Sequence, residues 1–309
     1  MSYLVYLLVR VALWLLRLFP LRVIARLGRA GGALAYALDR RHRRVAVDNL
    51  TRCFGDSKTQ EEIRALAREN FKRIGENFAA AVKTSSMSEA AIRECVELVG
   101  AEHVLPAAKD GKPQGRIIAI GHFGNFELYA RCNYFVPGLQ FATTYRGINQ
   151  PLLNRVLQDL RNQSGCLYFE RRSEGGALRR ALQNQGIMLG LLVDQHAGDH
   201  GLRVPFFGRD CSTSAAPGIY AQRYRLPLHV AICYRVGLGR WRIEMGEEIP
   251  TFEAGQPRAS EAVAADINKA YEVAIRRDPA NWFWVHRRWK ATHYRTKSSA
   301  SETANPTPG

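Results

Sequence analysis

The stretch GRIIAIGHFGNFELYAR, residues 115–131, decides the fold and carries the first candidate for chemistry. Its apolar run RIIAI is typical of a buried strand, and the glycines around His122 predict a turn directly after it. We expect Asn125 to cap a helix that begins near Phe126, which places Glu127 in the first turn. Because sites in open α/β sheets form at the carboxyl ends of strands, His122 lies where such a site is expected.

Outward from this stretch, apolar runs alternate with helical patterns. The expected strands are 116–120, 140–145, 187–193 and 228–236. The expected helices are 60–83, 151–163, 174–185 and 261–277, with another that starts at Ser88. This alternation predicts an α/β fold with a mainly parallel central sheet flanked by helices. We expect one domain over 46–293 and a disordered tail over 294–309, whose composition is poor in large apolar residues.

The first 45 residues have a separate character. Residues 3–19 read YLVYLLVRVALWLLRLF, in which only Arg10 and Arg17 are polar. A bilayer-spanning helix needs roughly 17–25 residues. A second apolar stretch, 23–38, precedes the basic run RRHRR at 40–44. Basic residues beside an apolar segment favour the anionic cytoplasmic leaflet. We therefore expect residues 1–45 to form a membrane anchor with a basic juxtamembrane segment, either as one short crossing or as an in-plane helix.

Composition limits the class of protein and of partner. The chain has 309 residues, with 44 Lys and Arg against 28 Asp and Glu, a net charge of +16. An apolar content of 46% excludes a wholly disordered chain or a collagen-like fibre. The positive charge predicts an anionic partner: nucleic acid, an acidic membrane surface or an acidic carrier protein. Six scattered cysteines without a C-x-x-C pair are typical of reduced thiols and argue against a zinc site or a disulfide framework.

The residue pattern favours general base catalysis. A histidine acts as a base near neutral pH when a carboxylate orients it, and Glu127 is the carboxylate nearest to His122 in the sequence. Because the chain has no G-x-S-x-G motif, we expect the acceptor's own hydroxyl to attack. His196 and His200 have zinc-like spacing, but Gly198 and Gly201 disfavour a helix there. We predict no metal site and no cofactor.

Here the chain resembles the bacterial lipid A biosynthesis acyltransferases, which belong to the H-x4-D/E glycerolipid acyltransferase group. The resemblance covers most of the chain in five ordered blocks. These are RRHRRVAVDNLTRCF (40–54), GHFGNFE (121–127), TYRGINQPLLNRVLQDLR (144–161), GIMLGLLVDQHAGDHGLRVPFFGR (186–209) and NWFWVHRRWK (281–290). It implies acyl transfer from an acyl-carrier-protein thioester to a hydroxyl of a lipid A precursor or a similar anionic glycolipid, at the cytoplasmic face of the inner membrane.

The resemblance also implies residue roles. His122 would remove the proton from the acceptor and Glu127 would hold His122 in the right tautomer, while backbone N–H groups of the glycine-flanked turn are candidate oxyanion donors. Arg146 and Asn149 stand where the family has Arg and Asn after a strand, although Gly147 replaces a common proline. The candidate substrate-binding residues are Asn125, Arg146, Asn149, Arg161 and Asp194; the arginines suit phosphate, and Asp194 is placed to orient Arg146 or His122.

Several interpretations stay open at this point. The segment 204–209, VPFFGR, is either an apolar wall of the site or a core-packing loop. Trp282, Trp284 and Trp289 form either an aromatic belt at the membrane interface or core aromatics. A second function is a lysophospholipid or phosphatidylinositol-mannoside acyltransferase that uses acyl-CoA. A remote third is a basic nucleic-acid-binding protein, which the absence of a recognisable nucleic-acid-binding motif disfavours.

Overall fold

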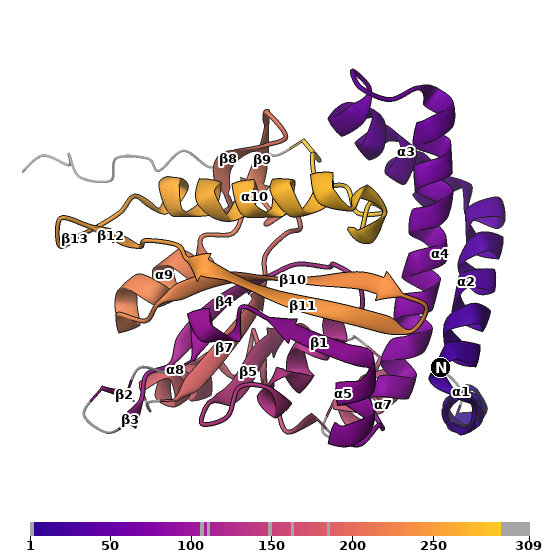
Figure 1. Cartoon of the computed structure of the whole chain (residues 1–309), viewed down its shortest axis with the longest axis horizontal. Helices are drawn as coiled ribbons and strands as arrows, with labels where there is room; N and C mark the ends of the chain where they lie inside the picture. The colour runs from indigo at the N-terminus through magenta and orange to yellow at the C-terminus, as the bar shows by residue number, and fades with distance from the viewer. Residues whose placement is uncertain are drawn as a thin grey trace, which may run out of the picture.

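The computed structural model describes residues 3–105, 108–109, 112–147, 150–161, 164–183 and 186–291. Its centre is a seven-stranded sheet with the order β1-β11-β10-β4-β7-β5-β6. All neighbouring strands in this sheet are parallel except β10 and β11, which form an antiparallel pair. The expected mixed α/β fold with a mostly parallel, helix-flanked sheet is therefore confirmed (Figure 1).

The elements have the following bounds. The helices are α1 Tyr3–Leu18, α2 Leu21–Leu38, α3 Arg40–Phe54, α4 Gln60–Thr84, α5 Glu89–Cys95, α6 Ala101–Val104, η1 Phe126–Tyr134, α7 Pro151–Arg161, α8 Gly175–Gln183, α9 Ala216–Tyr224, α10 Ser260–Arg277 and η3 Pro279–Asn281. The strands are β1 Val96–Val99, β2 Ala108–Lys109, β3 Lys112–Pro113, β4 Arg116–Ile120, β5 Gln140–Tyr145, β6 Leu167–Glu170, β7 Ile187–Leu192, β8 Leu202–Phe206, β9 Arg209–Thr213, β10 Leu228–Gly237, β11 Arg240–Glu248, β12 Phe252–Glu253 and β13 Gln256–Pro257.

The central strand β4 shows how the sheet divides the core. Because side chains alternate across a strand, Ile117 and Ala119 join one apolar cluster and Ile118 and Ile120 join another. The first cluster is closed by residues of α3, α4, α8, α9 and α10, and the second by residues of α5, α6 and η1. All five residues of β4 are buried, as its apolar sequence predicts. The carboxyl end of β4 therefore lies between the two apolar clusters.

The helices α2 and α3 belong to the body of the domain. Helix α2 lies along α4 (Figure 1), and three glycines bring the two backbones together: a Cβ added at Gly75 would lie 2.2 Å from the Gly28 carbonyl oxygen, and one at Gly32 would lie 2.1 Å from that of Phe71. Helix α3 buries Leu50 in the core. The boundary expected between residues 45 and 46 falls inside α3, so the separate anchor expected over 1–45 must be corrected. A run of small and apolar residues is therefore compatible with close helix packing as well as with membrane contact.

The expected crossing helix also finds no support. Over the described part of the chain, no helix combines the length and the apolar character that a bilayer crossing requires. Helix α1 has 16 residues and includes two arginines. The expected disordered tail, 294–309, lies outside the described residues.

Candidate active site

His122 is held by Asp194 at the carboxyl ends of two adjacent parallel strands. β4 and β7 pair in register from Arg116 to Ile120, so the residues that follow them come together. The His122 ring Nδ1 lies 2.8 Å from Asp194 Oδ1, and the His122 backbone N–H donates to Asp194 Oδ2, also at 2.8 Å. A carboxylate only accepts hydrogen bonds, so Nδ1 carries the proton and Nε2 keeps its lone pair. A neutral imidazole held in this orientation can accept a proton at Nε2.

The Asp194 carboxylate lies beneath the site and is 1% exposed. Trp282 Nε1 donates to its Oδ2 at 2.8 Å, so three donors in all surround it. Burial alone would raise the pKa of Asp194, but the charge of His122 and the hydrogen bonds from His122 and Trp282 outweigh it and hold the pKa below its ordinary value. The acid is therefore ionised at neutral pH and orients the imidazole. Its burial corrects the expectation that Asp194 contacts substrate.

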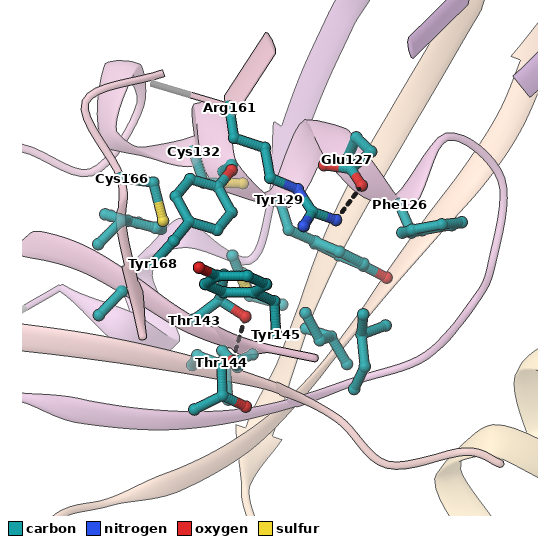
Figure 2. Close-up of a pocket in the computed structure, with 18 residues that line it drawn as sticks. Phe126, Glu127, Tyr129, Cys132, Thr143, Thr144, Tyr145, Arg161, Cys166 and Tyr168 are labelled. Carbon is teal, nitrogen blue, oxygen red and sulfur yellow. Dashed lines mark hydrogen bonds and ion pairs between the residues drawn. The ribbon is translucent and has the colours of Figure 1, made fainter. Parts of the chain in front are cut away.

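Glu127 has a different partner from the one expected. Its carboxylate accepts from the Arg161 guanidinium at 2.9 Å, and the Arg161 side chain also lies over the rings of Tyr145 and Tyr168 at 5.8 and 5.4 Å (Figure 2). The orienting acid of His122 is Asp194, so that part of the prediction is wrong. The reason is topological: adjacent parallel strands bring residue 194 to residue 122, whereas the first turn of η1 carries Glu127 toward α7.

An apolar pocket opens beside this ion pair. Figure 2 shows it between η1 and the strands β4 to β7, with Glu127 and Arg161 at one side and Cys132 and Cys166 further in. Most of its lining is aliphatic or aromatic, as in a site for an apolar ligand. Burial raises the pKa of the Cys166 thiol to about 12, so this cysteine is not a nucleophile. We call this hollow the inner pocket.

Aromatic side chains frame the His122 ring. The ring of Phe126 lies 4.8 Å from it and that of Phe283 5.8 Å, and Phe78 on α4 packs edge-on against both phenylalanines. His122, Glu127 and these three rings line a small hollow, the His122 pocket. The His122 side chain is 18% exposed, so it is accessible from this hollow. Sequence reasoning did not single out Phe283 or Phe78.

The remaining predicted residues have varied positions. Asn125 is at the N-cap position of η1, which begins at Phe126 as expected, but its side chain makes no capping bond. It is 1% exposed, and its amide donates to Thr84 at 3.4 Å. Arg146 is exposed immediately after β5, at the same end of the sheet as His122. Asn149 lies outside the described residues.

The backbone N–H groups of the turn are already used. Those of His122, Phe123 and Gly124 donate to Asp194, Gly121 and Asn281 respectively, which removes the expected oxyanion donors at these three positions. Gly124 itself requires glycine, because its φ is +52° and a Cβ there would lie 2.5 Å from the Cys233 carbonyl oxygen.

The C-terminal aromatic block is structural. Trp282 and Trp284 are 1% and 0% exposed, and Phe206 of the segment 204–209 is fully buried beside Trp282 and Trp289. Both segments therefore belong to the core. Within the described ranges, no group of three or more His, Cys, Asp or Glu side chains is arranged to hold a metal ion. The backbone N–H of His196 donates to His286, and His200 is exposed.

Comparison with known proteins points to one family. A family model described as bacterial lipid A biosynthesis acyltransferase matches residues 1–291. The lipid A biosynthesis palmitoleoyltransferase of Escherichia coli strain K12 is 26% identical over 285 residues, covering 90% of this chain and 88% of that protein. The lipid A biosynthesis lauroyltransferase of the same organism is 27% identical over 289 residues, covering 90% and 89%. A crystal structure of the 1-acyl-sn-glycerophosphate (LPA) acyltransferase PlsC from Thermotoga maritima aligns with a TM-score of 0.38 and 14% identity, over 85% of this chain and 99% of that one.

Proposed function

Because the chain belongs to the bacterial lipid A biosynthesis acyltransferase family and is an acyltransferase, we propose that it moves a fatty acyl chain from an acyl-carrier-protein thioester to a hydroxyl of a lipid A precursor or a similar anionic glycolipid. The observation that carries this proposal is the His122–Asp194 pair, whose histidine is 18% exposed and lines a hollow that adjoins an apolar pocket.

The chemistry follows from the geometry of that pair. His122 Nε2 takes the proton of the acceptor hydroxyl as the oxygen attacks the thioester carbonyl carbon. Asp194 stabilises the resulting imidazolium and keeps its Nδ1 proton in place. The tetrahedral intermediate collapses, the C–S bond breaks, and the imidazolium returns its proton to the departing thiolate. A thioester is already activated, so positioning, worth roughly 7–11 kcal/mol of barrier, and one base suffice.

The inner pocket suits the transferred chain. Its walls include Ile118, Ile120 and Leu192, and it shares Phe126 and Glu127 with the His122 pocket. Burial of each methylene is worth about 0.8 kcal/mol, so a pocket of this character binds a fatty chain well. The thioester carbon would then lie near Phe126, beside the His122 ring. This arrangement supports a fatty acyl donor over a short one.

A basic groove supports the acidic carrier protein as donor. It is formed by α3 and the C-terminal segment, and its cationic lining comprises Arg40, Arg41, Arg44, Arg52, Arg287 and Lys290. Asn49 of α3 holds that segment by donating to the carbonyls of Trp284 and His286 at 2.8 and 2.7 Å. The same segment contains Trp282, which binds Asp194. An acidic protein bound in this groove would contact the segment that contains Trp282, the residue that donates a hydrogen bond to Asp194.

The apolar face of α1 supports association with a membrane. Leu7, Val11, Trp14, Leu15 and Leu18 recur at helical spacing and are between 42% and 62% exposed. Leu34 and Leu38 of α2 are 59% and 71% exposed. An apolar stripe on a basic protein is typical of a helix that lies in the interface of an anionic bilayer. We propose that the protein acts at the cytoplasmic face of the inner membrane and that nucleic acid is not a partner; the exposed apolar stripe supports the membrane part of this proposal.

The test is acyl transfer by the purified protein. It is incubated with acyl-carrier-protein and coenzyme A thioesters and with a lipid A precursor or a lysophospholipid, and the products are weighed by mass spectrometry. We expect transfer to the lipid A precursor and its loss in His122→Ala, whereas His200→Ala, at an exposed histidine, retains it. Transfer to the lysophospholipid alone would contradict the proposed acceptor. Near-normal activity of His122→Ala would rule out His122 as the base.

The donor has its own test. The double change Arg41→Glu and Arg44→Glu should raise KM for the carrier-protein thioester and leave KM for the coenzyme A thioester unchanged. The matched control is Arg179→Glu with Arg180→Glu, at exposed positions of α8. An equal effect of both pairs would contradict docking in the groove.

A further inference from the structure

Three hollows meet around the Glu127–Arg161 ion pair. Two of them are the inner pocket and the His122 pocket. The third lies between α4, η1 and α7, and we call it the α4–α7 pocket; its apolar lining includes Phe78, Ala81, Val82, Ala130 and Leu160. Glu127 lines all three hollows, while Arg161 lines the inner pocket and the α4–α7 pocket. The ion pair, 2.9 Å between Nη2 and Oε1, therefore stands between two apolar spaces.

The α4–α7 pocket has a neighbouring hollow at α1. Leu160 lines both the α4–α7 pocket and a surface hollow between α1 and α7 to which Arg10, Trp14 and Arg17 contribute. Arg10 pairs with Asp159 of α7 at 2.8 Å, and Arg17 donates to Ser85, a residue of the α4–α7 pocket, at 3.4 Å. The α4–α7 pocket therefore shares lining residues with a hollow beside the exposed apolar helix α1 and with the His122 pocket.

We propose that the α4–α7 pocket binds a hydrocarbon chain that the acceptor lipid already carries, while the inner pocket binds the chain being transferred. This inference rests on the proposed acyltransferase function and adds to it a binding place for the acceptor's own chain. The two chains must both reach one reacting centre, and Phe126 with Glu127 joins the inner pocket to the His122 pocket, as Phe78 with Ala81 joins the α4–α7 pocket to it.

The charged groups that line the α4–α7 pocket already have partners within the chain. Arg161 pairs with Glu127, and Arg131, which is 4% exposed, donates to the Tyr134 hydroxyl and to the Ser85 carbonyl. The lining that remains for a bound chain is apolar and includes Val82 and Leu160. The ion pair keeps the two chains apart, and it keeps Arg161 over the rings of Tyr145 and Tyr168. Glu127 acts here as a positioning residue.

The experiment fills the α4–α7 pocket and varies the acceptor chain. Val82→Phe is compared with Val273→Phe, the same substitution at a 63% exposed position of α10. Two acceptors are used in detergent micelles: a lipid A precursor and an analogue with shortened chains. Each buried methylene is worth about fourfold in affinity, so displacing a few of them should raise KM for the long-chain acceptor by about tenfold or more. KM for the short-chain acceptor and the preferred donor chain length should not change.

Other results would overturn the inference. An equal change of KM for both acceptors, or no change in either, would show that Val82 does not face an acceptor chain. A shift in donor chain preference would place the donor chain there instead. If Val82→Phe does not fold, Leu160→Ala enlarges the pocket, and an unaltered preference among acceptor chain lengths would refute the proposal. Absence of transfer by the unaltered protein would instead refute the proposed function, and this inference with it.

Discussion

Replacement of Asp194 by asparagine should change the tautomer of the His122 ring while it leaves the fold of the site intact. In the structure, Oδ2 accepts from the His122 backbone N–H and from Trp282 Nε1, and Oδ1 faces the ring Nδ1. An asparagine that places its oxygen at the Oδ2 position keeps the first two bonds. Its NH₂ group then faces Nδ1, so the ring must move its proton to Nε2. The base is lost while the fold stays intact.

The magnitude of the effect follows from the role of the base. General base catalysis contributes about 10²–10⁴-fold, so kcat should fall by that factor, equivalent to about 2.7–5.4 kcal/mol of barrier. By contrast, Asp194→Ala leaves three donors without their acceptor, of which Trp282 Nε1 is buried with the acid, and the loss of that buried partner alone should cost about 1–3 kcal/mol of folding free energy. The asparagine variant should therefore unfold near the wild-type temperature, and the alanine variant well below it.

The assay is the rate of acyl transfer at saturating donor and acceptor, with thermal unfolding measured on the same preparations. Asp199→Asn, at an exposed aspartate five residues along the same loop, is the matched control and should retain full activity. The reasoning is refuted if Asp194→Asn keeps kcat within about threefold of the wild type, because the tautomer would then not matter.

Two further predictions concern stability. Gly75→Ala should lower the free energy of unfolding by about 1–3 kcal/mol, because its Cβ would lie 2.2 Å from the Gly28 carbonyl oxygen. The control Gly31→Ala should be neutral or stabilising, because a Cβ there has nothing within 4 Å. Equal denaturant midpoints for the two variants would contradict the close packing of α2 on α4. Burial lowers the pKa of His286 to about 4 from the ordinary 6.5, so the unfolded chain takes up this proton first and stability is lost as pH falls from about 6.5 to 4. Urea unfolding at pH 7 and 4.5 should show a smaller loss for His286→Gln, and an equal loss in both proteins would refute this role.

The centre of the sheet was predictable because the runs that form β4 and β7, RIIAI and IMLGLL, are almost entirely apolar. The expected strands 116–120 and 140–145 match β4 and β5, and 60–83 matches α4 within one residue. The Thr59–Glu62 capping box, present at the start of α4, is a local signal that needs no tertiary context. The antiparallel strand β11, which lies between β1 and β10, was not predicted, since RWRIEMGEE alternates charged and apolar residues and contains no continuous apolar run.

The partner of His122 was only partly predictable. Asp194 was among the residues expected to orient His122, and strand order settles its position, but strand order cannot be obtained from apolar runs. Glu127 lies closer in sequence, yet η1 is a 3-10 helix, and its first turn directs the carboxylate to Arg161. Trp282, which donates to Asp194, left no signal beyond its place in the C-terminal block.

For the N-terminal region, the sequence predicted a membrane segment where the structure shows helix packing. Residues 23–38 resemble a membrane segment because small and apolar residues dominate them, but Gly28 and Gly32 serve close packing of α2 on α4. The same composition supports either role, and only the position of α4 decides between them. The apolar face of α1 is exposed, and its expected contact with a membrane stays a prediction.

The most direct test of the central claim is the tautomeric state of His122 by ¹⁵N NMR of histidine-labelled protein at neutral pH, with His122→Gln used to assign the signals. The account predicts a ring protonated at Nδ1 and unprotonated at Nε2, with the pattern reversed in Asp194→Asn. A His122 ring that carries its proton on Nε2 in the unaltered protein would contradict the claim that this nitrogen accepts the proton of the lipid hydroxyl.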